Sequence, residues 1–290
     1  MSEPTRLEFR AADGAAIAAY RWDPVGNVRA IAQITHGVGE HAQRYAPLAD
    51  KLANEGYVVY AHDHRGHGAS LQPGANLGEI GQSGWSELVA DIGGMNSVAR
   101  SAYPSLPLAL IAHSMGSFAT QQYLLDHSPN VDAAVLSGTA ALDLLEPALD
   151  LDAPMDLAMF NAGLDQRRTD FDWLSRDEEQ VDRYLADPLC GFGLDVEGAK
   201  AMFAGARQLS DPARMAAIRS DLPIYIVVGD MDPVNGQLAL VNVLFSRLTD
   251  AGVNDVTVKV YEGARHEVFN ETNREDVIAD LISWLQDKLL

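Results

Sequence analysis

The stretch that decides the fold is residues 108–118, which read LALIAHSMGSF. The first five residues are apolar throughout, as expected of a strand that is covered on both faces of its sheet. The apolar run stops at His113 and Ser114, and a helical sequence follows at once. Small residues, Ala112 and Gly116, stand two positions before and two positions after Ser114. We therefore predict a sharp strand-to-helix turn with Ser114 at its tip.

The predicted turn places Ser114 where a nucleophile would act. Such a turn lifts the serine hydroxyl group above the carboxyl end of the sheet. The N-terminus of the following helix offers free N–H groups and the positive end of its dipole, and both favour a developing oxyanion. The competing interpretation is that Ser114 only caps the helix, because serine is a common N-cap residue. The strand before it, in the middle of the predicted sheet, favours the nucleophile.

Strand and helix patterns alternate on both sides of this stretch. An opening hairpin is predicted across the Asp13-Gly14 turn, and further strands are predicted at residues 30–35, 57–62, 131–138, 224–230 and 256–263. Helical spacing of apolar residues occurs at 43–55, 85–100, 115–127, 236–250 and in the C-terminal segment, where Thr272 and Glu275 fit a capping box. This alternation predicts an α/β fold with a mostly parallel central sheet covered by helices.

The alternation stops in the middle of the chain. Residues 139–220 contain no convincing strand, and their first part is an apolar helical region interrupted by prolines. A structureless loop of this length is improbable inside a compact domain. We therefore expect residues 1–138 and 221–290 to form the core and residues 139–220 to form a helical cap inserted between two strands.

Composition restricts the possible functions. The chain has 290 residues, is 47% hydrophobic and carries a net charge of −20, so a full core is expected and nucleic-acid binding is not. The N-terminus has no apolar signal segment and no stretch reads as a membrane span, which favours a cytoplasmic protein. The single cysteine, Cys190, excludes an intrachain disulfide. No base is placed for it by the sequence, so a small buried residue is expected rather than a nucleophile.

A serine nucleophile needs a base, and the base needs an orienting carboxylate. His266 is the only histidine after residue 127, and it lies in the loop before the last helix. The carboxylate is Asp230 or Asp232, at the end of a predicted strand. Strand alternation sends both side chains the same way, but Pro233 ends the strand and favours Asp232.

Two histidine-rich segments follow early strands. In residues 36–41, HGVGEH, the glycines allow the backbone to approach a substrate, and the Val38 and Met115 N–H groups are candidates for an oxyanion hole. An ordinary glycine-rich turn is the alternative. Residues 62–67, HDHRGH, concentrate metal-ligand types, but Arg65 lies among them and no second cluster has matching spacing. We expect a polar loop there and no metal site.

Five motifs together carry a resemblance to a known family. They are HGVGEHAQRY (36–45), AHDHRGHGAS (61–70), AHSMG (112–116), GDMDPV (229–234) and YEGARHEVFNE (261–271). In this order they resemble the monoacylglycerol lipase and lysophospholipase group of α/β-hydrolases, which is often filed with the serine-aminopeptidase-like hydrolases. The resemblance runs from about residue 6 to 288 and is weakest in the helical insert. One departure is Ala112, where the family usually has glycine, and we expect its methyl group to be tolerated.

The resemblance implies a set of roles for the candidate residues. It makes Ser114 the nucleophile, His266 the base and Asp232 the acid, since the family's acid matches the second aspartate of GDMD. It makes the backbone N–H groups of Val38 and Met115 the oxyanion hole. It implies no metal and no organic cofactor.

The resemblance also bears on the substrate. The cap usually carries the acyl pocket in this family, and the Leu- and Met-rich run at 142–160, with Met155 and Met159, fits an alkyl-chain channel. Glu40 and His41 are expected to contact a polar head group such as glycerol. The alternative for the apolar run is helices that pack on the body of the protein.

Three functions are open from the sequence. The first is a serine hydrolase that cleaves carboxylic esters with one apolar chain through an acyl-enzyme. The second is an amide or peptide hydrolase that uses the same triad. The third is a non-enzymatic binding protein, which would predict a broken triad. The first implies a small-molecule ester substrate and allows transient contact of the cap with a lipid surface.

Overall fold

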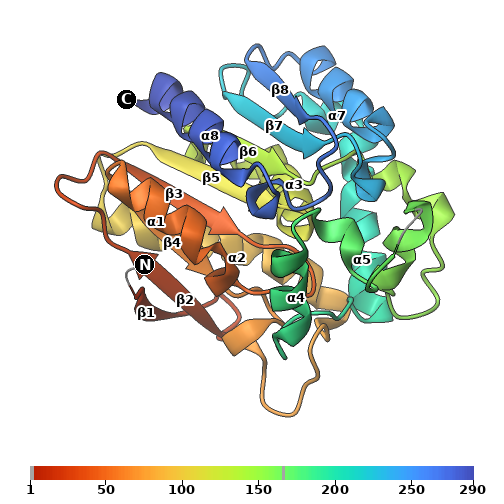
Figure 1. The fold of residues 1–290 in the computed structure, drawn as a ribbon. Helices are drawn as coiled ribbons and strands as arrows, with labels where there is room; N and C mark the ends of the chain where they lie inside the picture. The colour runs from red at the N-terminus through yellow and green to blue at the C-terminus, as the bar shows by residue number, and fades with distance from the viewer. Residues whose placement is uncertain (1–2, 165–166) are drawn as a thin grey trace.

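An eight-stranded sheet forms the centre of the computed structural model, which describes residues 3–164 and 167–290 (Figure 1). Its strand order is β1-β2-β4-β3-β5-β6-β7-β8. The strands are β1 (Thr5–Arg10), β2 (Ala16–Trp22), β3 (Ala30–Thr35), β4 (Tyr57–His62), β5 (Leu108–His113), β6 (Ala133–Ser137), β7 (Ile224–Gly229) and β8 (Val256–Tyr261). β2 is antiparallel to β1 and β4, and all other neighbours are parallel. The predicted α/β fold is confirmed.

The central strands are apolar because both of their faces are covered. Every residue of β3, β4, β5, β6 and β7 is buried. β5 lies between β3 and β6, where Ile111 is opposite Ile34 on one side and Val135 on the other. The predicted position of the strand before Ser114 in the middle of the sheet is therefore confirmed.

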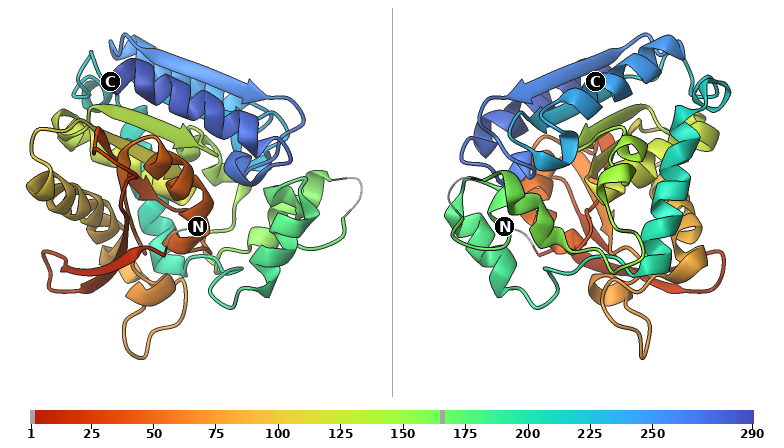
Figure 2. Two further views of the ribbon diagram at one scale, coloured as in Figure 1. Left: turned by 60° about the vertical axis from the view of Figure 1, so that its left-hand side comes forward. Right: turned by 90° about the vertical axis from the view of Figure 1, so that its right-hand side faces the viewer.

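Helices cover both faces of the sheet (Figure 2). The α-helices are α1 (Ala46–Asn54), α2 (Gly81–Ala102), α3 (Met115–His127), α4 (Glu178–Ala186), α5 (Val196–Ala206), α6 (Pro212–Met215), α7 (Ala239–Asp250) and α8 (Arg274–Leu289). Buried side chains of α1 and α8 share one apolar cluster, and those of α2, α3, α5 and α7 share another. The two clusters lie on opposite faces, so the sheet is the middle layer of three.

Short 3-10 helices complete the chain. They are η1 (Ala42–Tyr45), η2 (Gly68–Ser70), η3 (Ser128–Asn130), η4 (Leu142–Leu144), η5 (Glu146–Ala148), η6 (Leu157–Gly163), η7 (Asp172–Leu174), η8 (Arg207–Ser210), η9 (Pro233–Asn235) and η10 (Val268–Asn270). Between β6 and β7 the described residues form helices and turns but no strand. Within that segment α5 packs against α2 and α3 of the body.

The start of the last helix differs from the prediction. α8 begins at Arg274, and its N-cap is Asn273, whose side chain makes no capping hydrogen bond. The Glu275 carboxylate instead pairs with Lys51 at 2.7 Å. The predicted capping box of Thr272 and Glu275 is therefore wrong, because the helix starts one residue later than the box requires.

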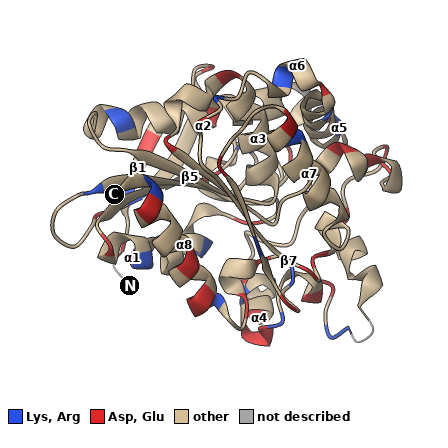
Figure 3. Ribbon diagram, turned by 90° about the horizontal axis from the view of Figure 1, so that it is seen from above, with Lys and Arg blue, Asp and Glu red and all other residues tan. Residues whose placement is uncertain are grey.

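The surface is rich in carboxylates. Acidic residues are spread over surface helices such as α4 and α8 (Figure 3). No helix among the described residues is long and apolar enough to cross a bilayer.

Candidate active site

Ser114 lies at the tip of the turn between β5 and α3, as predicted. Its backbone has φ +50° and ψ −121°, a strained conformation for a residue other than glycine. Such strain costs about 1–3 kcal/mol and is typical of functional turns. Gly116 allows the turn to pass close to β3, since an added Cβ there would lie 2.4 Å from the His36 carbonyl oxygen. Ala112 is buried in the larger apolar cluster, so its methyl group is accommodated without loss of the turn.

His266 and Asp232 meet at the same edge of the sheet. His266 Nδ1 lies 2.9 Å from Asp232 Oδ2, and the exposed fractions of the two residues are 1% and 0%. The other Asp232 oxygen accepts the Val234 N–H at 2.9 Å, which fixes the carboxylate. Asp230 accepts a hydrogen bond from the Gly263 N–H at 2.7 Å and so stabilises the loop that leads to His266. Of the two candidate aspartates, Asp232 is the one in contact with the imidazole.

The backbone connects Ser114 to His266. The Ser114 N–H donates to the Ser137 carbonyl oxygen at 2.9 Å. The next residue, Gly138, lies against His266, because a Cβ added to it would be 2.9 Å from the His266 Cε1 atom. The serine and the imidazole therefore both contact the same two-residue segment at the end of β6, Ser137 and Gly138.

The surroundings of His266 suit a base. Its ring lies between the rings of His113 and Trp173, with centroids 4.8 and 4.9 Å away. Burial opposes protonation, but the charge and hydrogen bond of Asp232 outweigh it, so the pKa of His266 is raised. Its Nε2 atom is buried and has no hydrogen-bond partner among the described residues. That nitrogen is therefore free to accept a proton.

The glycine-rich loop at 36–41 packs against Ser114 at Gly37. A Cβ added to Gly37 would lie 3.1 Å from the Ser114 Cβ atom. Val38 and Met115 line the same pocket as Ser114. Met115 is the first residue of α3, so its N–H has no acceptor within the helix. The structure thus brings together the two residues predicted to supply the oxyanion hole.

Glu40 is engaged within the protein. One carboxylate oxygen accepts the Gly37 N–H at 2.5 Å and the Tyr45 hydroxyl at 2.7 Å. The other accepts from Arg44 at 2.5 Å. Burial raises the pKa of Glu40. These contacts favour a role for Glu40 in shaping the loop rather than in holding a head group.

Arg44 continues this network to the residue beside His266. Its guanidinium donates two hydrogen bonds to Glu267, at 2.7 and 2.9 Å. Burial alone would raise the pKa of Glu267, but Arg44 holds it down at about 2. The guanidinium also lies 4.8 Å from the Tyr184 ring centroid. Sequence reasoning missed this pair, although Glu267 directly follows His266 and Arg44 lies within the first motif.

An apolar pocket adjoins Ser114, and most of its walls come from the segment between β6 and β7. Its volume is about 40 Å³, a few times what one water molecule requires. The predicted run contributes Leu142, Leu145, Leu149, Met155, Leu157 and Phe160. Met159 is 41% exposed and lines a neighbouring groove that shares Leu149 and Met155 with this pocket, so only Met155 of the two predicted methionines lines the pocket beside Ser114.

The sequence did not indicate several other walls of this pocket. They are Phe118, Trp173, Met202, Phe203 and Val234. Met202 and Phe203 belong to α5, which also packs on the body. All five wall residues are apolar residues of helices or 3-10 helices. Apolar residues of the core occupy the same kind of position, so the local sequence does not show which of them line the pocket.

The histidine-rich loop after β4 is built into the core. His62, His64 and His67 are fully buried, and burial lowers the pKa of each. The His64 N–H donates to His36 Nε2 at 2.9 Å, which links this loop to the glycine-rich loop. Arg65 is largely buried and pairs with the carboxylates of Asp13 and Asp91. These contacts favour a structural role for the loop.

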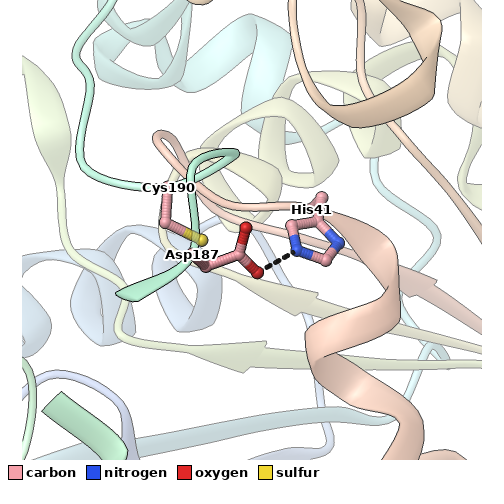
Figure 4. A group of neighbouring side chains, drawn as sticks. All are labelled: His41, Asp187 and Cys190. Atoms are coloured by element: carbon pink, nitrogen blue, oxygen red, sulfur yellow. Dashed lines mark hydrogen bonds and ion pairs between the residues drawn. The ribbon is translucent and has the colours of Figure 1, made fainter. Parts of the chain in front are cut away.

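His41 contacts Asp187 and is engaged outside the pocket beside Ser114. Its Nε2 lies 2.9 Å from the Asp187 carboxylate, and Cys190 lies beside both residues (Figure 4). His41 is not among the residues that line the pocket next to Ser114. Asp187 and Cys190 follow α4, so this contact joins the glycine-rich loop to the segment between β6 and β7.

Comparison with known proteins shows the family to which this chain belongs. The family described as "Serine aminopeptidase, S33" matches residues 26–273. A monoacylglycerol lipase of Mycolicibacterium smegmatis is 35% identical over the whole of both chains. A monoglyceride lipase of Mus musculus is 30% identical over 96% of this chain and 89% of its own. A thermostable carboxyl esterase from Bacillus coagulans, solved with glycerol, has a TM-score of 0.87 at 26% identity and full coverage of both chains.

Proposed function

Because the chain belongs to the serine aminopeptidase S33 family of α/β-hydrolases and is a carboxylic-ester hydrolase, we propose that Ser114, His266 and Asp232 are its catalytic triad. The observation that carries this proposal is the contact of His266 Nδ1 with Asp232, which leaves a buried Nε2 without a partner at the edge where Ser114 stands. An imidazole held in this way can take a proton from a serine.

In the first half of the reaction, Ser114 Oγ attacks the ester carbonyl carbon and its proton passes to His266 Nε2. Asp232 stabilises the imidazolium that forms. The developing oxyanion accepts hydrogen bonds from the Val38 and Met115 N–H groups. The bond to the alkoxy oxygen then breaks, and His266 gives its proton to the leaving alcohol.

In the second half, a water molecule attacks the acyl-enzyme. His266 takes a proton from the water, and the same N–H groups hold the new oxyanion. When the tetrahedral intermediate collapses, Ser114 leaves with the proton from His266 and the carboxylic acid is released. No metal or organic cofactor is required for either half.

We propose that the substrate is an ester with one apolar chain, of the monoacylglycerol type. Two of the relatives are named for this activity, and the pocket beside Ser114 is lined almost entirely by apolar side chains. The pocket is narrow, so a long chain must displace wall residues. Met155 is suited to this because its unbranched side chain adapts at low cost.

We also propose that residues 139–220 act as a cap that makes transient contact with lipid. This segment supplies the pocket walls, and it carries large apolar side chains that are more than one-third exposed. They are Leu144, Met159, Leu185 and Leu189. Burial of such exposed apolar side chains in lipid is favourable, which supports the proposed contact.

A rate series tests the proposed substrate. Monoesters of glycerol and of a simple phenol are compared across short to long acyl chains. The highest kcat/KM for long glycerol esters supports the proposal. A maximum for short phenyl esters would contradict it and indicate a general esterase. Turnover of a matched anilide at a rate comparable with the ester would favour an amide hydrolase on the same triad.

A further inference from the structure

Three side chains with metal-binding chemistry meet outside the proposed triad. His41 comes from the loop that carries Val38, and Asp187 and Cys190 come from the segment that follows α4 (Figure 4). His41 Nε2 and Asp187 Oδ2 lie 2.9 Å apart. One ligand atom from each of the three side chains lies within 4.8 Å of the other two.

The spacings of the three ligand atoms, from 2.9 Å to at most 4.8 Å, bracket those of a zinc site. Tetrahedral coordination with ordinary Zn–N, Zn–O and Zn–S bonds holds its ligand atoms about 3.3–3.7 Å apart. His41 Nε2 and Asp187 Oδ2 must therefore move slightly apart to hold one ion between them, and the Cys190 sulfur must lie within about 3.7 Å of each. Three protein ligands and a water molecule make a four-coordinate site with one open position.

The backbone already orients two of the ligands. Asp187 and Cys190 are three residues apart, and the Cys190 N–H donates to the Asp187 carbonyl oxygen at 3.0 Å. The Leu189 N–H donates to Asp187 Oδ1 at 2.9 Å, which leaves Oδ2 directed at His41. Hydrogen bonds that fix a ligating carboxylate in this way strengthen metal binding.

The same turn is attached to the glycine-rich loop. The Gly191 N–H donates to the Gly39 carbonyl oxygen at 3.0 Å. Gly39 also packs closely on this segment, because a Cβ added to it would be 2.4 Å from the Phe192 carbonyl oxygen. The third ligand, His41, therefore stands at a fixed place relative to the other two.

We propose that His41, Asp187 and Cys190 bind one Zn²⁺ ion that joins residues 187–190 to the loop carrying Val38. The thiol proton of Cys190 passes to solvent as the Zn–S bond forms, the proton on His41 Nε2 moves to Nδ1 through solvent so that Nε2 can bind the ion, and water fills the fourth position. A thiolate and an imidazole select Zn²⁺ over Mg²⁺ or Ca²⁺, which prefer oxygen ligands. The ion takes no part in ester cleavage.

The ion restrains the cap, an effect that rests on the proposed function. The pocket beside Ser114 is too narrow for a long acyl chain unless its walls move, and many of those walls belong to the same segment as Asp187 and Cys190. A metal link between this segment and the loop beside Ser114 opposes that movement. Bound Zn²⁺ therefore lowers the turnover of long-chain esters.

Cobalt is the probe, because four-coordinate Co²⁺ bound to a thiolate has a characteristic charge-transfer absorption band. Chelator-treated, reduced protein is titrated with Co²⁺ and then with Zn²⁺. We expect one equivalent of Co²⁺ to produce the thiolate band and Zn²⁺ to remove it. Cys190→Ser abolishes the band, Asp187→Asn weakens Co²⁺ binding by about tenfold or more, and Asp152→Asn, an exposed aspartate of the same segment, leaves both unchanged.

A wild-type protein without the thiolate band at saturating Co²⁺, or a band that persists in Cys190→Ser, would overturn the site. Neither readout requires activity, so failure of the proposed function would not mimic this result. For the restraint, Zn²⁺ is expected to lower kcat on a long-chain ester several-fold in wild type and not in Cys190→Ser. An unchanged wild-type rate with the band present would overturn the restraint alone.

Discussion

Arg44 and Glu267 form a two-point ion pair that joins η1, which follows the loop carrying Val38, to the residue after His266, with N–O distances of 2.7 and 2.9 Å. Both side chains are largely buried. Removal of one partner from such a pair leaves an uncompensated buried charge, which costs about 3–5 kcal/mol. We predict that Arg44→Ala lowers the free energy of unfolding by about this amount, measured in urea. The exposed pair Arg183–Glu179 is the control, and Arg183→Ala should change stability by less than about 1 kcal/mol.

The Arg44–Glu267 ion pair also predicts how the free energy of unfolding depends on pH. The pKa of Glu267 is about 2 in the folded protein against an ordinary value of 4.5. A lowered carboxyl pKa adds stability above pH 4.5, and this contribution is lost as the pH falls from about 4.5 to 2. The stability difference between wild type and Glu267→Gln should therefore shrink across that range. A difference that stays constant from pH 6 to pH 3 would contradict the ionised pair.

The His266–Asp232 contact predicts the pH dependence of the rate. The base must be neutral to accept a proton, and the pKa of His266 is raised by Asp232 above the ordinary value of 6.5. The acidic limb of kcat/KM should therefore have its midpoint above pH 6.5 in wild type. In Asp232→Asn the limb should move to lower pH, and kcat should fall by about 10⁴-fold. A limb at the same pH in both proteins would show that another group controls it.

The turn that presents Ser114 predicts opposite outcomes at its two small residues. Gly116→Ala places a methyl group 2.4 Å from the His36 carbonyl oxygen, so backbone must move and both activity and melting temperature should fall sharply. Ala112→Gly removes a methyl group from a strand and should cost only about 0.5–1 kcal/mol with near-normal activity. Activity assays and thermal melts of the two variants check this. Equal losses of activity and of melting temperature in the two variants would contradict the close approach of backbone at Gly116.

The two methionines of the predicted channel test the pocket. Met155 lines the cavity beside Ser114, whereas Met159 is exposed and lines only the neighbouring groove. Met155→Trp should block the pocket and lower kcat/KM for long-chain esters by about tenfold or more while leaving acetyl esters nearly unaffected. Met159→Trp should leave both nearly unchanged. Similar profiles for the two variants would place the acyl chain elsewhere.

The sequence was most informative where short stretches determine their own geometry. The turn at Ser114 follows from an apolar strand, a small residue on each side and an immediate helix, and the structure has all three. His266 and Asp232 follow from the order of motifs along the chain, and they are in contact. The mostly parallel sheet follows from the alternation of strands and helices.

Contacts between residues that are far apart in the chain could not be predicted from the sequence. Arg44 and Glu267 are separated by 223 positions, and no local sequence pattern indicates that they form an ion pair. Trp173 lies against His266 because the segment between β6 and β7 folds back over the sheet, and that path depends on tertiary packing. Thr272 and Glu275 had the right spacing for a capping box, but the helix starts at Arg274.

The central claim is that Ser114 is the nucleophile, and covalent trapping tests it most directly. Wild type, Ser114→Ala and Ser117→Ala are treated with a fluorophosphonate, and the modified peptide is identified by mass spectrometry. Ser117 is a fair control because its hydroxyl is buried three residues further on and donates to the Ser114 carbonyl oxygen at 2.6 Å. We expect one adduct on Ser114 in wild type and in Ser117→Ala, and none in Ser114→Ala, together with loss of ester hydrolysis. An adduct on another residue, or ester hydrolysis that persists in Ser114→Ala, would contradict the account.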